Sequence, residues 1–358
     1  YMSSQNNISL NFWSDIYDII DKIAYLDYFA SDGKMYMHIG EVSSITFGYG
    51  QLLRNYTNSQ AHPRVQRTGL MGNYELSENF MDFEGFISDF NDFKNTGGLV
   101  GLRSTIFLSQ NLPITIGFSL VADVNQYAGL PDKTDYWSSL GDTVTSRTYY
   151  GLALDATYEI YNSYDYSIDL FTENVGIWFP ENRRFDREYL DIRRDGSWGI
   201  TFPGLHFGYR NSFNISAAFH YNSSLFIPNY FNSTYDMERV RNIIFDSSNE
   251  IEGKMLGDLI KFYDLIYFDT VAGDSTGDLR SLILTKDLST IIEDTQNKYR
   301  TSGYSVNLKT NLSYIGGLEI YFQDLTEIIS DNVESVEEII PKYYQTLDFR
   351  FHLNEKVL

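Results

Sequence analysis

The 358-residue sequence contains no cysteine, which excludes a disulfide framework, a thiolate metal site and a cysteine nucleophile. Positive charge is also scarce, because 27 Lys and Arg residues stand against 48 Asp and Glu residues and leave a net charge of −21. Nucleic-acid binding needs clustered positive charge, so we expect no nucleic-acid partner. The sequence has no run of about 18 apolar residues, which excludes an ordinary transmembrane helix.

Aromatic residues, by contrast, are abundant. They make up 16% of the chain, with 29 Tyr and 25 Phe, although the mean hydropathy is mildly polar at −0.29. A transmembrane β-barrel combines these two properties, because only every second residue of a strand meets lipid while Tyr and Trp gather at the membrane interfaces. The composition therefore favours a membrane barrel over a soluble enzyme.

Several segments alternate between apolar and polar residues with the period of a β-strand. The clearest are Ile114–Asn125, Tyr149–Tyr161 and Phe213–Asn222, and Ser44–Leu52 is a further candidate. The first three have about 10 residues or more, enough for a tilted strand to cross a bilayer. We predict an all-β fold, an antiparallel transmembrane β-barrel of about 12–16 strands. Pro203 interrupts a predicted strand and must lie at a bulge or a strand end.

Two parts of the chain depart from this period. Four isoleucines between positions 16 and 23 have helical spacing behind a cap at Ser14, so we predict a helix at Ser14–Leu26 within an N-terminal segment, residues 1–32. Residues 235–300 also follow a helical period and predict a helical insert that forms a plug or an extracellular loop. The barrel strands are then expected in residues 33–234 and 301–358.

If the apolar residues of each strand face lipid, the opposite residues line the lumen. The charged residues predicted there are Asp82, Glu84, Asp123, Asp155, Glu159, Asp169, Glu173, Glu319 and Asp348, with the basic residues Arg103, Lys309 and Arg350. A mostly acidic wall raises the local concentration of cations, so an open pore would prefer them. The alternative is that these carboxylates are the solvated half of alternating strands and pair with the three basic residues.

A basic cluster stands out against the acidic background. It consists of Arg183, Arg184, Arg187, Arg193 and Arg194. Arginine side chains fit phosphate groups well, so the cluster is a candidate contact for lipopolysaccharide or a positive constriction in the pore. Four interleaved acidic residues cancel its charge locally, and this pattern favours a solvated loop.

The sequence lacks a recognisable catalytic set. Its five histidines, His38, His62, His206, His220 and His352, are scattered, so we expect no metal site, no cofactor and no enzymatic activity. His220 shares a predicted polar face with Ser216 and Asn222, which leaves an outer-membrane rim hydrolase as a minor alternative.

Three short segments carry a resemblance to a known group of proteins. Ile45–Gly50, Asn91–Lys94 and Val121–Leu130 resemble a family of uncharacterised, porin-like outer-membrane β-barrels of diderm bacteria. The similarity spans roughly residues 33–130. It implies a barrel fold and a bacterial outer-membrane location, with lipid and lipopolysaccharide as partners, and it transfers no catalytic residues. The sequence shows no signal peptide, and we expect the export signal to have been removed.

We therefore expect an outer-membrane, porin-like channel with a polar, mostly acidic lumen. The alternatives are a structural or assembly anchor whose insert binds a partner protein or a second copy of the chain, the rim hydrolase, and a soluble β-sandwich binding module. A sandwich also alternates apolar and polar residues. Small residues on the polar face and aromatic residues toward the ends of the apolar face favour the barrel.

Overall fold

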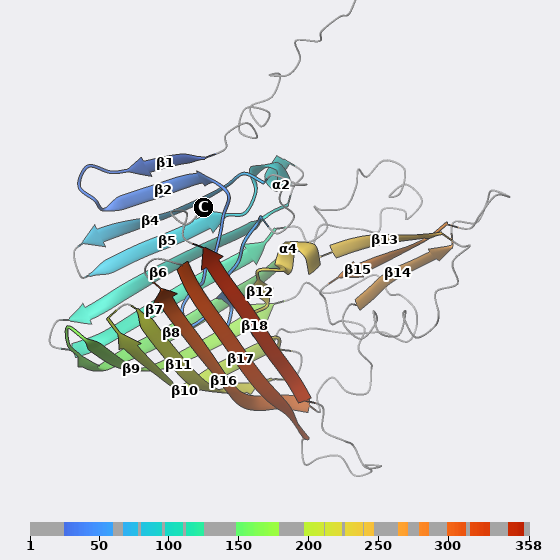
Figure 1. The fold of residues 1–358 in the computed structure, drawn as a ribbon. Helices are drawn as coiled ribbons and strands as arrows, with labels where there is room; N and C mark the ends of the chain where they lie inside the picture. Colours follow the sequence, from blue (N-terminus) through green and yellow to red (C-terminus); the bar gives the residue numbers. More distant parts are fainter. Residues whose placement is uncertain are drawn as a thin grey trace, which may run out of the picture.

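The computed structural model describes residues 25–59, 67–77, 80–94, 97–109, 112–124, 148–178, 197–210, 212–223, 226–238, 240–246, 264–270, 279–285, 299–312, 316–329 and 343–353. These residues are almost entirely β-strand, and one large antiparallel sheet of 13 strands dominates them (Figure 1). Among them, no helix is long and apolar enough to cross a membrane.

The strands of this main sheet follow one another in chain order. They are β1 (Leu26–Phe29), β2 (Met35–Gly40), β4 (Gly69–Ser77), β5 (Met81–Ile87), β6 (Leu99–Ser109), β7 (Leu112–Asp123), β8 (Tyr149–Asn162), β9 (Tyr166–Trp178), β10 (Ser197–Tyr209), β11 (Phe213–Asn222), β16 (Tyr299–Leu312), β17 (Gly316–Ile329) and β18 (Tyr343–Leu353). Two short helices, α2 (Phe90–Lys94) and α4 (Tyr235–Glu238), lie between strands.

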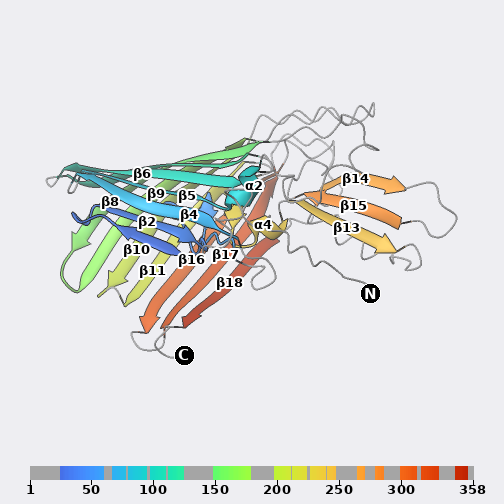
Figure 2. The ribbon, with the colours of Figure 1, turned by 90° about the horizontal axis from the view of Figure 1, so that it is seen from above.

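The sheet is strongly curled. In Figure 1, β16–β18 cross in front of the strands that precede them, and the view from above in Figure 2 shows the same curvature. The sheet therefore has a concave and a convex face. The three clearest alternating segments form most of β7, β8 and β11, which confirms the strand prediction for them.

Pro203 lies in β10 at an irregularity of the ladder. The register of β10 against both neighbouring strands shifts between Thr201 and Gly204. A proline cannot donate to the ladder, and a bulge removes the need for that hydrogen bond. The sequence-based expectation for this proline is confirmed.

The all-β, antiparallel architecture is as predicted, and its strand number falls within the expected range. β1 and β18 form the two edges, and no pairing joins them among the described residues. Because 13 strands alternate in direction along the sheet, β1 and β18 run the same way around it. Closure into a barrel is thus not observed in this part of the chain.

The prediction of a helical insert at residues 235–300 is wrong for the residues described there. Beyond α4, they form β13 (Val240–Asp246), β14 (Asp264–Thr270) and β15 (Leu279–Thr285), which pair in a separate antiparallel sheet in the order β13-β15-β14. A short apolar run such as Leu265–Phe268 fits a helix or a strand equally well by period alone, and its β-branched and aromatic residues favour the strand.

The predicted N-terminal helix, Ser14–Leu26, lies almost entirely outside the described residues. Its last residue, Leu26, begins β1 instead of ending a helix. The predicted strand Ser44–Leu52 is also wrong. These residues make only an isolated bridge between Ile45 and Tyr56 and a turn in which Gly48 and Gly50 have positive φ angles of 58° and 89°. Such angles suit glycine and interrupt a strand.

Candidate functional site

The interior of the curled sheet brings most of the predicted inner residues together. On the β5–β9 side, Arg103 forms ion pairs with Asp155 and with Glu84, the latter over 3.3 Å between Nε and Oε1. Both terminal nitrogens of Arg103 donate to Asp155, and Nη1 also donates to Ser119 Oγ over 2.9 Å. Glu173 lies opposite Asp155 in the β8–β9 register. We call these four charged residues the arginine cluster.

Three members of the arginine cluster are shielded from solvent, whereas the Glu84 side chain is 44% exposed. Arg103 is 7% exposed, Asp155 2% and Glu173 0%. A buried charge is tolerated when it is paired and hydrogen-bonded, and here one guanidinium faces three carboxylates. Arg103 pairs with Asp155 as the alternative expected, but this pair is buried rather than solvated.

A second group of charges lies on β16–β18. Glu319 on β17 accepts hydrogen bonds from Arg54 Nη2 and, over 3.1 Å, from Asn55 Nδ2. Lys309 Nζ lies 3.5 Å from the same carboxylate. Arg350 pairs with Asp348 over 2.9 Å and donates to the Asn55 backbone oxygen over 3.2 Å. Predicted residues of this wall thus meet two residues that the sequence did not single out.

Arg54 and Asn55 belong to a segment that runs through the interior. Residues 41–59 are part of the connection between β2 and β4, and we call them the first inner segment. On the β8–β9 wall, the Gln51 backbone N–H donates to Glu173 Oε2 over 3.1 Å. The Tyr49 hydroxyl lies 2.7 Å from Thr157 Oγ1, and its ring stacks on Phe171 with centroids 3.5 Å apart.

The first inner segment therefore bridges two walls of the sheet. Gln51 touches β9, and Arg54 reaches β17, where its guanidinium also lies 3.8 Å from the centroid of the Tyr321 ring. Three residue steps span at most about 11 Å. The Arg54, Glu173 and Glu319 side chains cover the rest of the distance between the two walls.

Residues 226–238 form a second inner segment that packs against the first. Its strand β12 (Phe231–Asn232) pairs in parallel with β3 (Leu53–Arg54). The Asn229 N–H donates to the Gln51 carbonyl over 2.8 Å. At the sheet, the Tyr235 hydroxyl donates to Asp123 over 2.8 Å, so this predicted inner carboxylate anchors the second segment.

The two inner segments and the sheet enclose an apolar core. It includes Phe47, Leu52, Leu53, Tyr56, Phe86, Leu99, Val121, Tyr149, Val175, Ile177, Tyr230, Phe231 and Tyr235. The wall residues of this core lie where β5, β7 and β9 end and where β6 and β8 begin. One end of the interior is therefore packed solid.

The other end of the interior keeps the acidic character predicted from the sequence. Asp82, Glu159 and Asp169 are neither buried nor fully exposed. Glu159 and Asp169 face each other near the hairpin between β8 and β9. His206 Nδ1 lies 3.0 Å from Asp169 Oδ2. Carboxylates predominate over basic groups at this end.

Burial changes the acid–base behaviour of the first inner segment. It raises the pKa of Tyr49 to about 12, because the phenolate would lose its hydration. Burial also lowers the pKa of Arg54 from its ordinary value, while Tyr321 and Glu319 oppose that change. The neutral phenol and the ion-paired guanidinium are both suited to holding the segment in place near neutral pH.

The hydrolase alternative gains no support from the geometry. His220 does not contact Ser216, which lies opposite His206 in the β10–β11 register. Instead, His220 Nδ1 lies 3.0 Å from Thr201 Oγ1, and Nε2 lies 2.7 Å from Ser305 Oγ. His220 is 5% exposed. A catalytic imidazole is commonly oriented by a carboxylate, and no described carboxylate bonds this ring.

Other predicted features are untested or unremarkable. The cluster Arg183, Arg184, Arg187, Arg193 and Arg194 lies outside the described residues. In the part of the chain that the structure describes, no group of three or more His, Asp or Glu residues is arranged to hold a metal ion.

The inner segments are what sequence reasoning missed. Their signal was the pair Gly48 and Gly50 within the apparent strand 44–52. A side chain at Gly48 would collide with Glu173 and Asp155, so only glycine lets the backbone lie this close to the arginine cluster. Two glycines separated by one residue within a strand-like pattern indicate a turn, or a backbone that lies close to another part of the protein.

No protein-family model, curated protein or solved structure matches this chain. The resemblance to porin-like barrels therefore stays an interpretation of the sequence.

Proposed function

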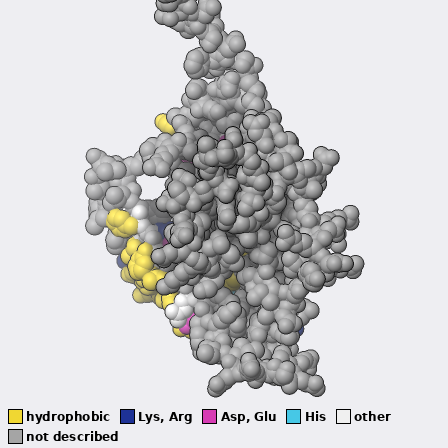
Figure 3. Space-filling model, turned by 90° about the vertical axis from the view of Figure 1, so that its right-hand side faces the viewer, with side chains coloured by type: hydrophobic (Ala, Val, Ile, Leu, Met, Phe, Trp, Pro, Cys, Tyr) yellow, Lys and Arg dark blue, Asp and Glu magenta, His cyan; other side chains and the backbone are white. Residues whose placement is uncertain are grey.

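We propose that the chain is a membrane-embedded β-barrel of the bacterial outer membrane, a porin-like channel narrowed by its two inner segments. The main support for this proposal is the distribution of side chains on the sheet, which is apolar on its convex face and charged on its concave face. On the convex face, Leu154 is 52% exposed and Phe349 63%, while the charged residues Arg103, Asp155 and Glu173 are buried on the concave face. Large exposed apolar surfaces are rare on monomeric soluble proteins, and they are the normal outer surface of a membrane barrel. Figure 3 shows hydrophobic side chains gathered along one margin of the described surface.

The strand dimensions agree with this proposal. β6–β11 and β16–β18 have 10 to 14 residues each, the length of a tilted membrane-spanning strand. On the convex face of β8, Tyr150 and Tyr158 are separated by a rise of about 26 Å along the strand. Tyr150 stacks with Trp178 near one end, and Tyr166 contacts Tyr209 near the other. Aromatic residues at both levels are typical of the two interfaces of a membrane barrel.

The interior favours a narrow, cation-preferring path over a wide pore. The inner segments fill one end, and the carboxylates at the β8–β9 hairpin end raise the cation concentration at the entrance. We expect small, cation-selective conductance in planar bilayers. Arg54→Gln removes the charge that binds Glu319 and should enlarge the conductance by loosening the first inner segment.

A matched control distinguishes loosening from a general charge effect. Arg210→Gln removes an exposed ion pair with Asp165 at a turn and should leave the conductance unchanged. If folded wild-type protein and Arg54→Gln both conduct no ions, the channel proposal is wrong.

Closure of the sheet can be tested directly because the chain has no cysteine. Single cysteines introduced along β1 and β18 form a panel of pairs without background thiols. A disulfide within one chain for any pair supports a closed barrel with a parallel β1–β18 seam. Disulfides only between chains contradict closure by these two strands.

A second candidate is the anchor function. The strands β13–β15 pair only with one another among the described residues, so they form a unit apart from the main sheet. Such a unit suits a docking module for a partner protein. Deleting residues 240–285 should then abolish partner association without changing conductance, whereas a channel plug would show increased conductance.

A further inference from the structure

Glu173 on β9 is a buried carboxyl group with one unused oxygen. The residue is 0% exposed. Its Oε2 accepts a hydrogen bond from the Gln51 backbone N–H of the first inner segment over 3.1 Å, whereas Oε1 is buried and has no hydrogen-bond partner among the described residues. Taking an ionised carboxylate out of water is strongly unfavourable unless a cation and hydrogen bonds compensate it. The nearby positive charge therefore decides whether Glu173 can be ionised here.

Arg103 is the basic side chain of this cluster, and its donors are directed at other groups. Nη1 and Nη2 donate to the two oxygens of Asp155, and Nη1 also donates to Ser119 Oγ over 2.9 Å. Nε lies 3.3 Å from Glu84 Oε1. In the part of the chain that the structure describes, no basic side chain forms an ion pair with Glu173. A second buried negative charge, on Glu173, would therefore remain unpaired.

A proton on Glu173 Oε1 removes this charge and gives the unused oxygen a partner. A β-carbon at Gly48 would lie 2.8 Å from Glu173 Oε1 and 3.0 Å from Asp155 Oδ2, so the two oxygens approach the first inner segment at the same place. Ionised carboxylates only accept hydrogen bonds, whereas a protonated one also donates. The protonated Oε1 can donate toward Asp155 while Oε2 still accepts from Gln51. A metal ion suits this place less, because Arg103 Nη1 would lie 3.3 Å from the same β-carbon.

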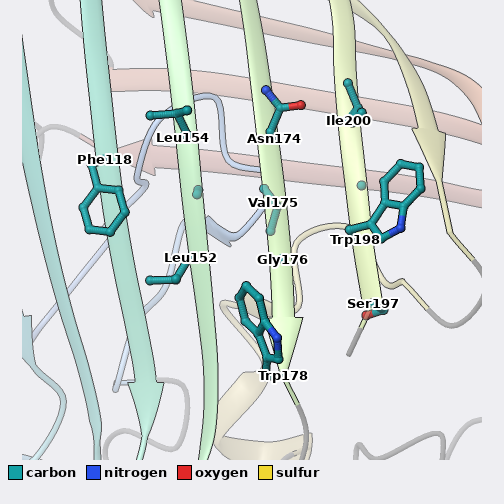
Figure 4. A pocket seen from close by; sticks show the side chains of 12 residues that line it. Phe118, Leu152, Leu154, Asn174, Val175, Gly176, Trp178, Ser197, Trp198 and Ile200 are labelled. Atoms are coloured by element: carbon teal, nitrogen blue, oxygen red, sulfur yellow. The ribbon is translucent and has the colours of Figure 1, made fainter. Parts of the chain in front are cut away.

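The other surroundings of Glu173 supply no compensating charge. On β10, the uncharged Thr201 is directly opposite, and its hydroxyl lies 3.0 Å from His220 Nδ1. The backbone N–H of Tyr49 also faces the carboxyl, and the phenols of Tyr49 and Tyr321 are neutral near pH 7. The convex side of the sheet at this level is uncharged as well, and it carries Phe118, Leu154, Asn174 and Ile200 (Figure 4).

We propose that Glu173 is a proton-binding site, and that its proton keeps the first inner segment docked on the β8–β9 wall. If the segment leaves, Glu173 becomes hydrated and ionises above about pH 4. The docked form thus holds one proton more than the undocked form. Docking is therefore strongest at low pH and weakens as the pH rises, by up to about tenfold in its equilibrium constant per pH unit, until the covered carboxyl ionises as well.

The effect on transport rests on the proposed channel function. The first inner segment narrows the interior where it bonds to β9 and β17. Its release from β9 should widen the path, so conductance should increase from about pH 5 to about pH 9. A second readout does not depend on conduction. Hydrogen exchange of the Gln51 N–H, which is bonded to Glu173 in the docked form, reports docking directly.

The test compares wild type with two variants in liposomes and planar bilayers, at matched pH. Glu173→Gln keeps the shape of the protonated side chain and cannot ionise. At about pH 9 its Gln51 N–H should exchange more slowly than that of wild type, by up to about tenfold for each pH unit over which docking weakens, and at about pH 5 the two should agree. Glu84→Gln is the matched control. It removes a carboxylate of the same cluster whose side chain is 44% exposed, and should keep the wild-type pH dependence.

Each outcome has a defined meaning. Equal pH profiles for wild type and Glu173→Gln, both folded in membranes, overturn the proton site and leave the proposed function intact. A profile that Glu84→Gln flattens and Glu173→Gln does not, or one that follows sodium concentration instead of pH, also overturns it. If exchange follows the expected order but no variant conducts ions, the proton site stands and the channel function is wrong.

A variant that does not fold still leaves a decisive measurement. Infrared spectra of the wild-type protein with isotope-labelled glutamate should show the carbonyl band of a protonated glutamate near neutral pH. Glu84→Gln should retain this band. Its absence from the folded wild-type protein overturns the proton site.

Discussion

Neighbouring residues on the same strand show how differently the two faces of the main sheet are built. On β6, Leu102 is 54% exposed on the convex face, while Arg103 is buried on the concave face. Leu154 and Asp155 repeat the contrast on β8. In a soluble protein, a sheet with one face in water exposes its polar residues and buries its apolar residues. The comparison teaches that the concave face has a polar interior of its own, and that the convex face exposes apolar side chains.

The largest expected effect comes from breaking the polar interior. Arg103→Ala leaves Asp155, Glu84 and Glu173 without their guanidinium, and such a change costs about 3–5 kcal/mol in the free energy of unfolding. Urea unfolding in liposomes, followed by tryptophan fluorescence, measures it. Leu102→Ala is the control on the opposite face and should cost less. A loss below about 1 kcal/mol for Arg103→Ala would show that solvent already screens the cluster.

The next largest effect comes from placing a charge on the convex face. Leu154 lies midway between the tyrosines at 150 and 158, which is the middle of the proposed bilayer. Leu154→Arg should therefore cost about 2–4 kcal/mol in lipid. Leu154→Phe should be nearly neutral. If the arginine variant is as stable as wild type and remains in solution without detergent, the convex face does not meet lipid.

The third expected effect is a dependence of stability on pH that comes from the buried Tyr49. Tyr49 ionises near pH 10 when unfolded and near 12 when folded, so the unfolded state loses its proton first as the pH rises. The stability associated with the buried phenol is complete below pH 10 and is lost between pH 10 and 12, by about 3 kcal/mol. Tyr49→Phe lacks this loss, and the other tyrosines cancel in the comparison. Parallel pH profiles for the two proteins would mean that the Tyr49 hydroxyl is hydrated.

The smallest effect concerns the aromatic residues at the strand ends. Tyr150→Leu removes the stacking on Trp178 and keeps an apolar side chain, so it should cost about 0.5–1.5 kcal/mol. The same liposome unfolding assay measures the change. A cost above that of Leu154→Arg would mean that the convex face is held by side-chain packing more than by lipid.

Side-chain period explains which parts of this structure could be predicted. The alternation in 114–125 and 149–161 places residues on faces directly, so the inner positions of Asp123 and Asp155 followed from strand period alone. The contact between Arg103 and Asp155 did not, because it depends on the register of strands 52 residues apart. The strands β13–β15 were mistaken for helices because short apolar runs carry no decisive period.

The first inner segment could not be predicted for a different reason. Its residues bond to side chains of β8, β9 and β17, and such contacts leave no trace in local sequence. Only Gly48 and Gly50 signalled a departure from a strand. Candidate site residues were therefore found where they belong to the wall and missed where they belong to the interior, as with Arg54 and Asn55.

The hydrogen bond between Arg54 and Glu319 joins residues 265 positions apart and has a consequence for how the protein assembles. Contacts this distant in sequence form late, because a long loop must close before they can stabilise anything. Until β17 docks, the first inner segment holds its contacts with β5, β8, β9 and the second inner segment. The folding rate should therefore be limited by the arrival of the last strands, which add the contacts on the β17 side of the interior.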